Sequence, residues 1–211
     1  MTGIINFETF LLAGIILNLT PGNDTIFILS RTIVQGRRAG IMSVLGIATG
    51  SVIHTTFAAL GLSIIIAESI VAFNIIKYAG AAYLVYIGYK MLTDKSHLNI
   101  EIHNKEKEVK SKKVYRDAVI TNLLNPKVAL FFIAFLPQFI DPGHKNTVLP
   151  FMLLGIAFTI TGTLWCLILA NFASIIADKI KQNNKVSSYI NKTCGLVLVG
   201  LGIKLAFSTR K

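Results

Sequence analysis

The sequence has little charge. Asp, Glu, Lys and Arg make up only 15% of its 211 residues, and only 10 of these residues are acidic. A soluble domain carries about 25% charged residues. Hydrophobic residues make up 53% of the chain, and the mean hydropathy is +0.64. This composition excludes an ordinary soluble domain and predicts a polytopic membrane protein.

Cysteine is also scarce. The two cysteines, Cys166 and Cys194, lie in different apolar segments and form no C-x-x-C pair. This pattern excludes a disulfide framework, a cysteine metal cage and a dithiol relay, and we interpret both residues as core cysteines. Residues 1–8 contain no Lys or Arg. They lack the basic region of a cleavable signal, so we expect the first apolar segment to act as its own uncleaved signal.

The formal net charge of +11 would suit a nucleic-acid partner, but the distribution of the charge excludes one. The basic residues lie in short segments between long apolar ones, which is the pattern of membrane topology. Six apolar segments reach the length of about 20 residues that a membrane-spanning helix needs. They are residues 4–29, 41–67, 71–92, 118–140, 148–176 and 189–207.

The basic residues also predict the orientation in the membrane. The connections after the first, third and fifth segments contain three, eight and three Lys or Arg residues, against five on the opposite side. The positive-inside rule places these three connections in the cytoplasm and both termini outside. The longest of them, 93–116, has the mixed charge of a solvated linker. It separates a first half, 1–92, from a second half, 117–211.

The two halves share a short motif. Leu-Thr-Pro at 19–21 in the first segment has a counterpart in Leu-Asn-Pro at 124–126 in the fourth. Three segments per half give the halves opposite orientations, as in many secondary transporters. Proline lacks a backbone N–H and breaks helices. The predicted fold is therefore all-α, with six transmembrane helices in two inverted three-helix repeats, broken helices one and four, and the two breaks meeting near the midplane.

The break in the first segment carries a carboxylate. Pro21 and Gly22 interrupt an apolar run, and Asp24 follows them directly. An ionisable residue at membrane depth is tolerated where it faces protein or water, so Asp24 is a candidate functional residue. The alternative is that Pro21 is a simple kink and Asp24 lies beyond the hydrocarbon. Further polar residues in this stretch are Asn18, Thr20 and Asn23.

The break in the fourth segment carries a cation. Lys127 follows Pro126, and it either pairs with Asp24 across the repeat or extends to the cytoplasmic surface. In the second segment, His54 acts either as a proton relay or as an interhelical hydrogen-bond partner. We predict that the substrate or proton site comprises Asn18, Thr20, Pro21, Gly22, Asn23, Asp24, His54, Asn122, Asn125, Pro126 and Lys127, with no metal site.

Small residues indicate close helix packing in the second segment. Gly46 and Gly50 lie four residues apart on one helical face, which lets a neighbouring helix approach closely. Such faces also permit a homodimer.

Several of these stretches resemble a known family. They are LTPGND at 19–24, SR at 30–31, GRRAG at 36–40, LGIATG at 45–50, NPKVALFF at 125–132 and LPQF at 136–139. Together they are similar to the two signatures of the LysE/RhtB family of bacterial amino-acid exporters. One departure is Asn23, where many members of that family have a second proline.

The resemblance implies a multi-pass transporter of the bacterial inner membrane that is not an enzyme and needs no cofactor. It would export a small amino acid or derivative, such as threonine, homoserine, homoserine lactone, leucine or lysine, by proton antiport. The half-helices after Pro21 and Pro126 would receive the substrate carboxylate, and Asp24 would take either the ammonium or the coupling proton.

Other classes of membrane protein remain as alternatives. A divalent-metal or other small-solute exporter would need more metal ligands than Asp24 and His54. A thiol-redox conduit would need a reactive cysteine pair, which Cys166 and Cys194 do not form. A membrane-embedded enzyme would need a nucleophile with a base, or a cluster of metal ligands, within the spans.

Overall fold

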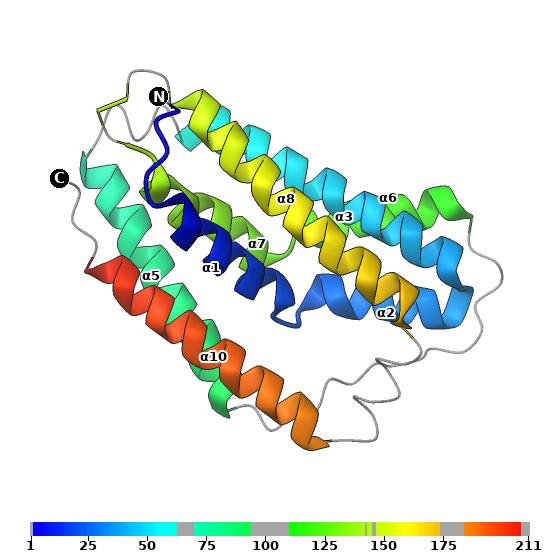
Figure 1. Cartoon of the computed structure of the whole chain (residues 1–211). Coiled ribbons are helices and arrows are strands. Elements are labelled where there is room, and N and C mark those ends of the chain that lie inside the picture. Colours follow the sequence, from blue (N-terminus) through cyan, green and yellow to red (C-terminus); the bar gives the residue numbers. More distant parts are fainter. Residues whose placement is uncertain are drawn as a thin grey trace.

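A computed structural model of the chain describes residues 2–62, 70–93, 110–141, 143–144, 147–173 and 184–207. These residues form helices, with one isolated antiparallel bridge between Ile4 and Ile140. Figure 1 shows the helices packed roughly along one direction, with α5 and α10 side by side along one edge. The all-helical part of the predicted fold is confirmed.

The elements follow in chain order. The first half contains α1 (Phe7–Leu19), α2 (Asn23–Gln35), α3 (Arg37–Phe57), the short π-helix η1 (Ala58–Leu62) and α5 (Ile70–Thr93). The second half contains α6 (Ser111–Leu123), α7 (Pro126–Leu130), the π-helix η2 (Phe131–Phe135), the 3₁₀-helix η3 (Leu136–Phe139), α8 (Val148–Asn171) and α10 (Asn184–Ala206).

Both predicted helix breaks are confirmed. The axes of α1 and α2 meet at 47° across Thr20–Gly22, and the axis of α6 meets that of the segment 126–139 at 48°. Each bend lies at a proline, which removes a backbone donor and ends the preceding helix. Beyond the second break the chain stays irregular, because Pro137 again lacks an N–H and η2 and η3 replace a regular α-helix.

The number of spans is only partly settled. Among the described residues, Arg37–Gly61 and Val148–Asn171 are long and apolar enough to cross a membrane, and each bent pair adds a span if it is counted as one, giving two to four. The six-span, inverted-repeat arrangement therefore stays a prediction. Of the predicted linker, 93–116, Thr93 is the last residue of α5 and residues 111–116 belong to α6, while residues 94–109 lie outside the described residues.

Close contacts fix the relative directions of the helices. Gly46 lies against Ala118 and Gly50 against Asn122, so α3 and α6 run the same way. Gly40 lies against Ala170 and Gly155 against Thr55, so α8 runs opposite to α3. These directions are the ones that alternating spans would give.

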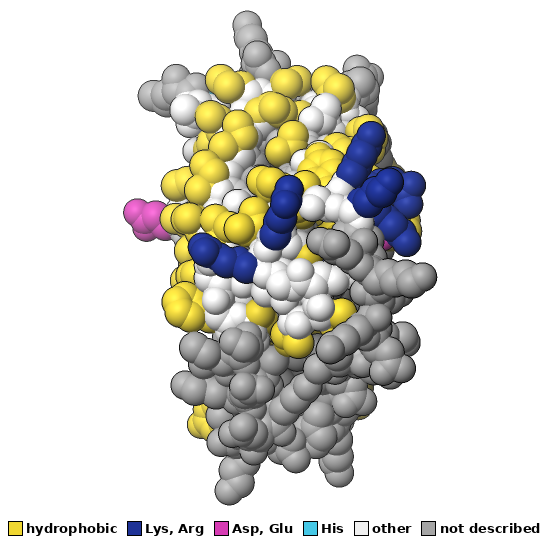
Figure 2. Space-filling view, turned by 90° about the vertical axis from the view of Figure 1, so that its right-hand side faces the viewer, with side chains coloured by type: hydrophobic (Ala, Val, Ile, Leu, Met, Phe, Trp, Pro, Cys, Tyr) yellow, Lys and Arg dark blue, Asp and Glu magenta, His cyan; other side chains and the backbone are white. Residues whose placement is uncertain are grey.

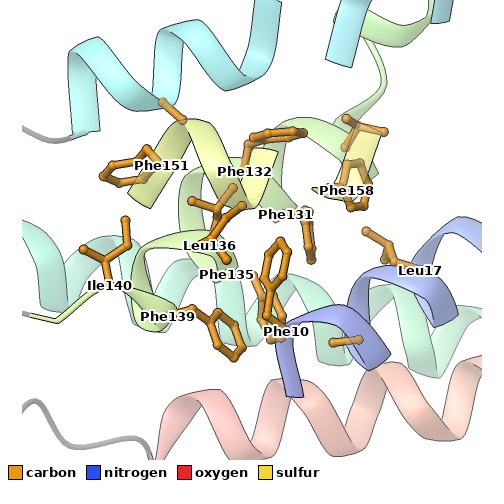
Figure 3. Packing of buried hydrophobic residues seen from close by; sticks show 14 of the residues in the cluster. Phe10, Leu17, Phe131, Phe132, Phe135, Leu136, Phe139, Ile140, Phe151 and Phe158 are labelled. Carbon is orange, nitrogen blue, oxygen red and sulfur yellow. The ribbon is translucent and has the colours of Figure 1, made fainter. Parts of the chain in front are cut away.

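Two apolar clusters lie on either side of the helix breaks. The first is aromatic, and Figure 3 shows its rings converging from α1, η2, η3 and α8; Phe131 stacks on Phe158 with ring centroids 4.5 Å apart. The second is aliphatic and joins α2, α3, α6 and α8; it comprises Ile28, Leu29, Val44, Ile47, Ala118, Cys166, Leu169, Ala170 and Ala173.

One end of the molecule is basic. Figure 2 shows Lys and Arg side chains gathered on the face that lies on the right of Figure 1, where α3 and α6 begin. The exposed cations there are Arg37, Arg38, Lys110, Lys112, Lys113 and Arg116. Arg31 on α2 pairs with Asp117 on α6 at 3.8 Å, and the exposed Arg37 donates from Nε to Asn171 Oδ1 on α8 at 2.7 Å.

Replacing Gly46 by alanine should loosen the contact between α3 and α6. A Cβ at this position would meet the Tyr115 carbonyl oxygen and the Ala118 Cβ, so backbone would have to shift. Such overpacking costs about 1–3 kcal/mol. Thermal unfolding of the detergent-purified protein should show a lower midpoint for Gly46→Ala. The matched change Gly200→Ala in α10, where a Cβ meets no atom within 4 Å, should leave the midpoint unchanged or raised, and equal midpoints for the two variants would contradict the packing.

Candidate functional site

The first break exposes backbone groups in the middle of the protein. The Leu17 carbonyl would normally accept a hydrogen bond from the N–H four residues later, and Pro21 has none. The Thr20 N–H folds back to the Ile16 and Leu17 carbonyls at 3.0 and 3.2 Å, which ends α1. Gly22 is extended at φ −167°, and α2 starts afresh at Asn23. The negative end of α1 therefore lies beside the positive end of α2.

Lys127 brings its charge to the end of α1. Its Nζ donates to the Thr20 carbonyl at 2.8 Å and to the Leu17 carbonyl at 3.1 Å. The second break positions it: Asn125 caps α7 by accepting from the Lys127 backbone N–H at 3.1 Å, and Pro126 occupies the first helical turn. The interpretation that Lys127 extends to the cytoplasmic surface is wrong, because its ammonium points into the protein onto carbonyls that the other break leaves open.

Asp24 occupies the first turn of α2, where the helix dipole stabilises a carboxylate. Its Oδ2 accepts from Asn122 Nδ2 at 2.8 Å, and Asn122 is only 1% exposed in the last turn of α6. Gly50 makes room for Asn122, since a Cβ there would overlap the amide. The prediction that the two breaks meet is confirmed by these contacts and by those of Lys127.

His54 reaches the same place from α3. Its Nε2 lies 3.3 Å from the Asn122 backbone carbonyl, and its ring stacks on Phe132 at 5.6 Å between centroids. The contact is an interhelical hydrogen bond, which is one of the two expected roles. It also places His54 next to the residue that bonds Asp24, so α3, α6 and α2 form one polar connection.

The remaining predicted residues lie around the first break. Asn18 Nδ2 donates to Thr161 Oγ1 at 3.2 Å and ties α1 to α8. Thr20 is fully buried, and its hydroxyl donates to the Ile16 carbonyl within α1. The Asn23 side chain is exposed. A Cβ on Gly22 would lie 3.3 Å from Lys127 Nζ, so glycine leaves space for the ammonium.

A small cavity lies beside the two breaks, and of the predicted site residues Asn18, Asp24, Asn122 and Lys127 line it. The volume of the cavity is about 30 Å³, which is room for no more than a few water molecules. Its polar lining comprises Asn18, Asp24, Thr25, Ser51, Asn122, Lys127, Thr159, Thr163 and Trp165. Its apolar lining comprises Leu17, Val44, Ile47, Val128 and Phe158.

Three buried polar atoms at this cavity have no hydrogen-bond partner among the described residues. They are Asp24 Oδ1, Asn122 Oδ1 and Trp165 Nε1. Buried polar atoms in folded proteins are nearly always paired, so unpaired ones at a cavity indicate a ligand, water or another conformational state. The cavity thus offers two acceptors, one of them a carboxylate oxygen, and one donor.

The sequence did not single out α8 as a wall of the site. Gly155, Thr159, Gly162 and Cys166 recur every three or four residues and therefore share one helical face. Gly162 lies against Asn18, and Thr159 and Gly162 line the cavity. Cys166, a free and buried thiol, lines the cavity too. A stripe of small and polar residues in an otherwise apolar helix could therefore have predicted, from the sequence, that α8 lines the site.

The arrangement does not resemble a metal centre. Among the described ranges, no group of three or more His, Cys, Asp or Glu side chains is placed to hold a metal ion. Asp24 and His54 contact different parts of Asn122 and leave the metal-exporter alternative without a ligand set there.

Comparison with known proteins gives the family. A family model described as LysE type translocator matches residues 15–209. This chain belongs to that family. Translocators are transporters, so the chain is a membrane transport protein and not an enzyme.

Two kinds of relative cover nearly the whole translocator. It is 36% identical over 198 residues to the uncharacterized membrane protein YrhP of Bacillus subtilis (strain 168), over 90% of this chain and 93% of that protein. It is 30% identical over 208 residues to the leucine efflux protein of Salmonella typhimurium (strain LT2), over 97% of this chain and 96% of the relative. The leucine efflux protein of Enterobacter sp. (strain 638) is 29% identical over 204 residues, with the same coverage. No solved structure matches the chain.

The hydrogen bond between Asp24 and Asn122 should appear as a coupling energy in a double-mutant cycle. Asp24→Ala, Asn122→Ala and the double variant would be compared by unfolding in detergent. We expect a coupling of about 1.5–3 kcal/mol, because the acceptor is a carboxylate. A control cycle pairs Asp24→Ala with Asn171→Ala, whose amide bonds Arg37 at the basic end, and should be additive within about 0.5 kcal/mol. Additivity in both cycles would contradict the contact.

Proposed function

We propose that this translocator exports a small amino acid with an aliphatic side chain, with leucine as the first candidate, in exchange for protons. The observation that carries this proposal is the cavity between the two helix breaks, with the unpaired oxygen of Asp24 in its wall. Family membership supports transport, and the relatives named leucine efflux proteins support the substrate class.

The cavity has the chemistry that a zwitterion requires. The substrate ammonium would bind Asp24 Oδ1 and Asn122 Oδ1, which are both acceptors without partners. Its carboxylate would face Trp165 Nε1 and the amino-terminal end of α2, where N–H groups and the helix dipole favour an anion. An aliphatic side chain would pack on the apolar part of the lining, formed by Val44, Ile47, Val128 and Phe158.

The conformation described here is a closed one. A cavity of about 30 Å³ has no room for an amino acid, and side chains of both apolar clusters line it. Binding therefore requires the half-helices to move apart. The breaks at Thr20–Gly22 and Leu124–Asn125 are the natural hinges, since Pro21 and Pro126 interrupt the helical hydrogen-bond pattern there and the helix axes bend by 47° and 48°.

Coupling to protons follows from competition for one carboxylate. Asp24 can hold a proton or a substrate ammonium, but both at once would leave the ammonium without its counter-ion in an apolar surrounding. Proton binding on one side and substrate binding on the other then give exchange. His54, whose Nε2 contacts the backbone carbonyl of the residue that bonds Asp24, is our candidate for the group that passes the proton on.

We further propose that the basic end of the molecule faces the cytoplasm of a bacterium, with both termini outside the inner membrane. The six exposed cations at the start of α3 and α6 support this orientation (Figure 2). The matched bends of 47° and 48° support the two inverted halves.

Efflux of radiolabelled leucine tests the proposed function directly. Cells or vesicles loaded with leucine should lose it through the wild-type protein, and a proton uncoupler should suppress the loss. Asp24→Asn should reduce the uncoupler-sensitive efflux at least about tenfold, which corresponds to roughly 1.4 kcal/mol. Glu8→Gln, an exposed acid in the first turn of α1, is the control and should export normally. Proton-driven export that survives in Asp24→Asn would rule out this coupling mechanism.

Single cysteines test the orientation. In a Cys166→Ala, Cys194→Ala background, Lys112→Cys at the basic end should react with a membrane-impermeant thiol reagent only after the cells are permeabilised. Asp141→Cys, exposed near the opposite end, should react in intact cells. The reverse pattern would invert the predicted topology.

A further inference from the structure

The carbonyls at the end of α1 form a site for a primary ammonium group, and Lys127 fills it. Thr20 O and Leu17 O lie 2.8 and 3.1 Å from Nζ. Both carbonyls belong to the last turn and cap of α1, at the negative end of the helix dipole. Gly22 keeps the space beside the ammonium open. This is a backbone site that selects a small hydrogen-bonding cation by geometry and charge.

The same lysine connects the two halves of the chain. Its backbone belongs to α7 at the second break, and its ammonium holds the end of α1 at the first break. Lys127 also lines the cavity in which Asp24 Oδ1 remains unpaired. The contact that fastens the hinge is therefore next to the place where a substrate ammonium would arrive.

We propose that Lys127 holds the closed state together: its ammonium occupies the carbonyl site of Leu17 and Thr20, and a substrate ammonium that binds beside it at Asp24 displaces it from these carbonyls. The proposal depends on the proposed function for the identity of the displacing ligand. Two cations in one small buried cavity repel each other, so the arrival of the substrate ammonium weakens the hold of Lys127 on α1. Displacement frees α1 from α7 and lets the broken helices separate.

Chemical rescue tests the carbonyl site without any transport assay. Lys127→Ala removes the ammonium and leaves a space, so its unfolding midpoint in detergent should fall below that of the wild type. Methylammonium chloride should then raise the midpoint of Lys127→Ala by about 2–4 °C, the shift expected for about 1 kcal/mol in a protein of this size. Tetramethylammonium chloride, which has no N–H to donate, should not. Wild type and Lys90→Ala, an exposed lysine on α5, should respond equally to both salts.

Equal effects of the two salts on Lys127→Ala would overturn the ammonium site. If Lys127→Ala does not fold, the site can be tested instead by reductive methylation of lysine side chains in the wild-type protein. Mass spectrometry of the Lys127 peptide would then compare labelling with and without saturating leucine. Leucine should increase the labelling of Lys127 at least about twofold and leave that of Lys90 unchanged, whereas equal labelling of Lys127 would overturn displacement.

The two proposals fail in distinguishable ways. Rescue by methylammonium together with no efflux of leucine would keep the ammonium site and reject the proposed substrate. Normal proton-driven leucine efflux without rescue or altered labelling would keep the exporter and reject the role of Lys127.

Discussion

The rest of the structure depends on the hydrogen bonds that the two proline breaks make to each other in an apolar interior. Each break leaves peptide groups without helical partners, and such groups are costly away from water. The first break supplies carbonyls at the end of α1 and a carboxylate at the start of α2; the second supplies the ammonium of Lys127 and the amide of Asn122. Charge on one break is thus matched by charge or dipole on the other, and neither break would be stable alone in this setting.

This mutual dependence explains why the site is both buried and incomplete. Asn122 donates to one oxygen of Asp24 and leaves the second unpaired, and its own side-chain oxygen is unpaired too. In an apolar surrounding, each of these missing hydrogen bonds raises the free energy of the folded protein. In the proposed mechanism, a ligand with an ammonium group would supply the missing hydrogen bonds, and the binding energy would favour opening at the two helix breaks.

Much of this was readable in the sequence, because proline, glycine and intramembrane charges have few permitted explanations. Pro21 and Pro126 predicted the breaks, and Asp24 and Lys127 predicted the charged meeting point. The direction of Lys127 was not readable, since a lysine near a helix end can extend to the surface or turn inward with equal local geometry. The irregular segment 131–139 was missed because an aromatic run has no distinctive period and the effect of Pro137 depends on packing against α1 and α8. The contribution of α8 was missed because a small-and-polar stripe predicts packing as readily as a cavity wall.

The position of Trp165 has an optical consequence. It is the only tryptophan in the chain, it lines the cavity together with Asp24 and Lys127, and its buried indole N–H has no partner among the described residues. Indole emission responds to nearby charge and to water. The protein therefore contains a single intrinsic fluorophore at its centre, and the colour of its emission follows what the cavity holds without any label being attached.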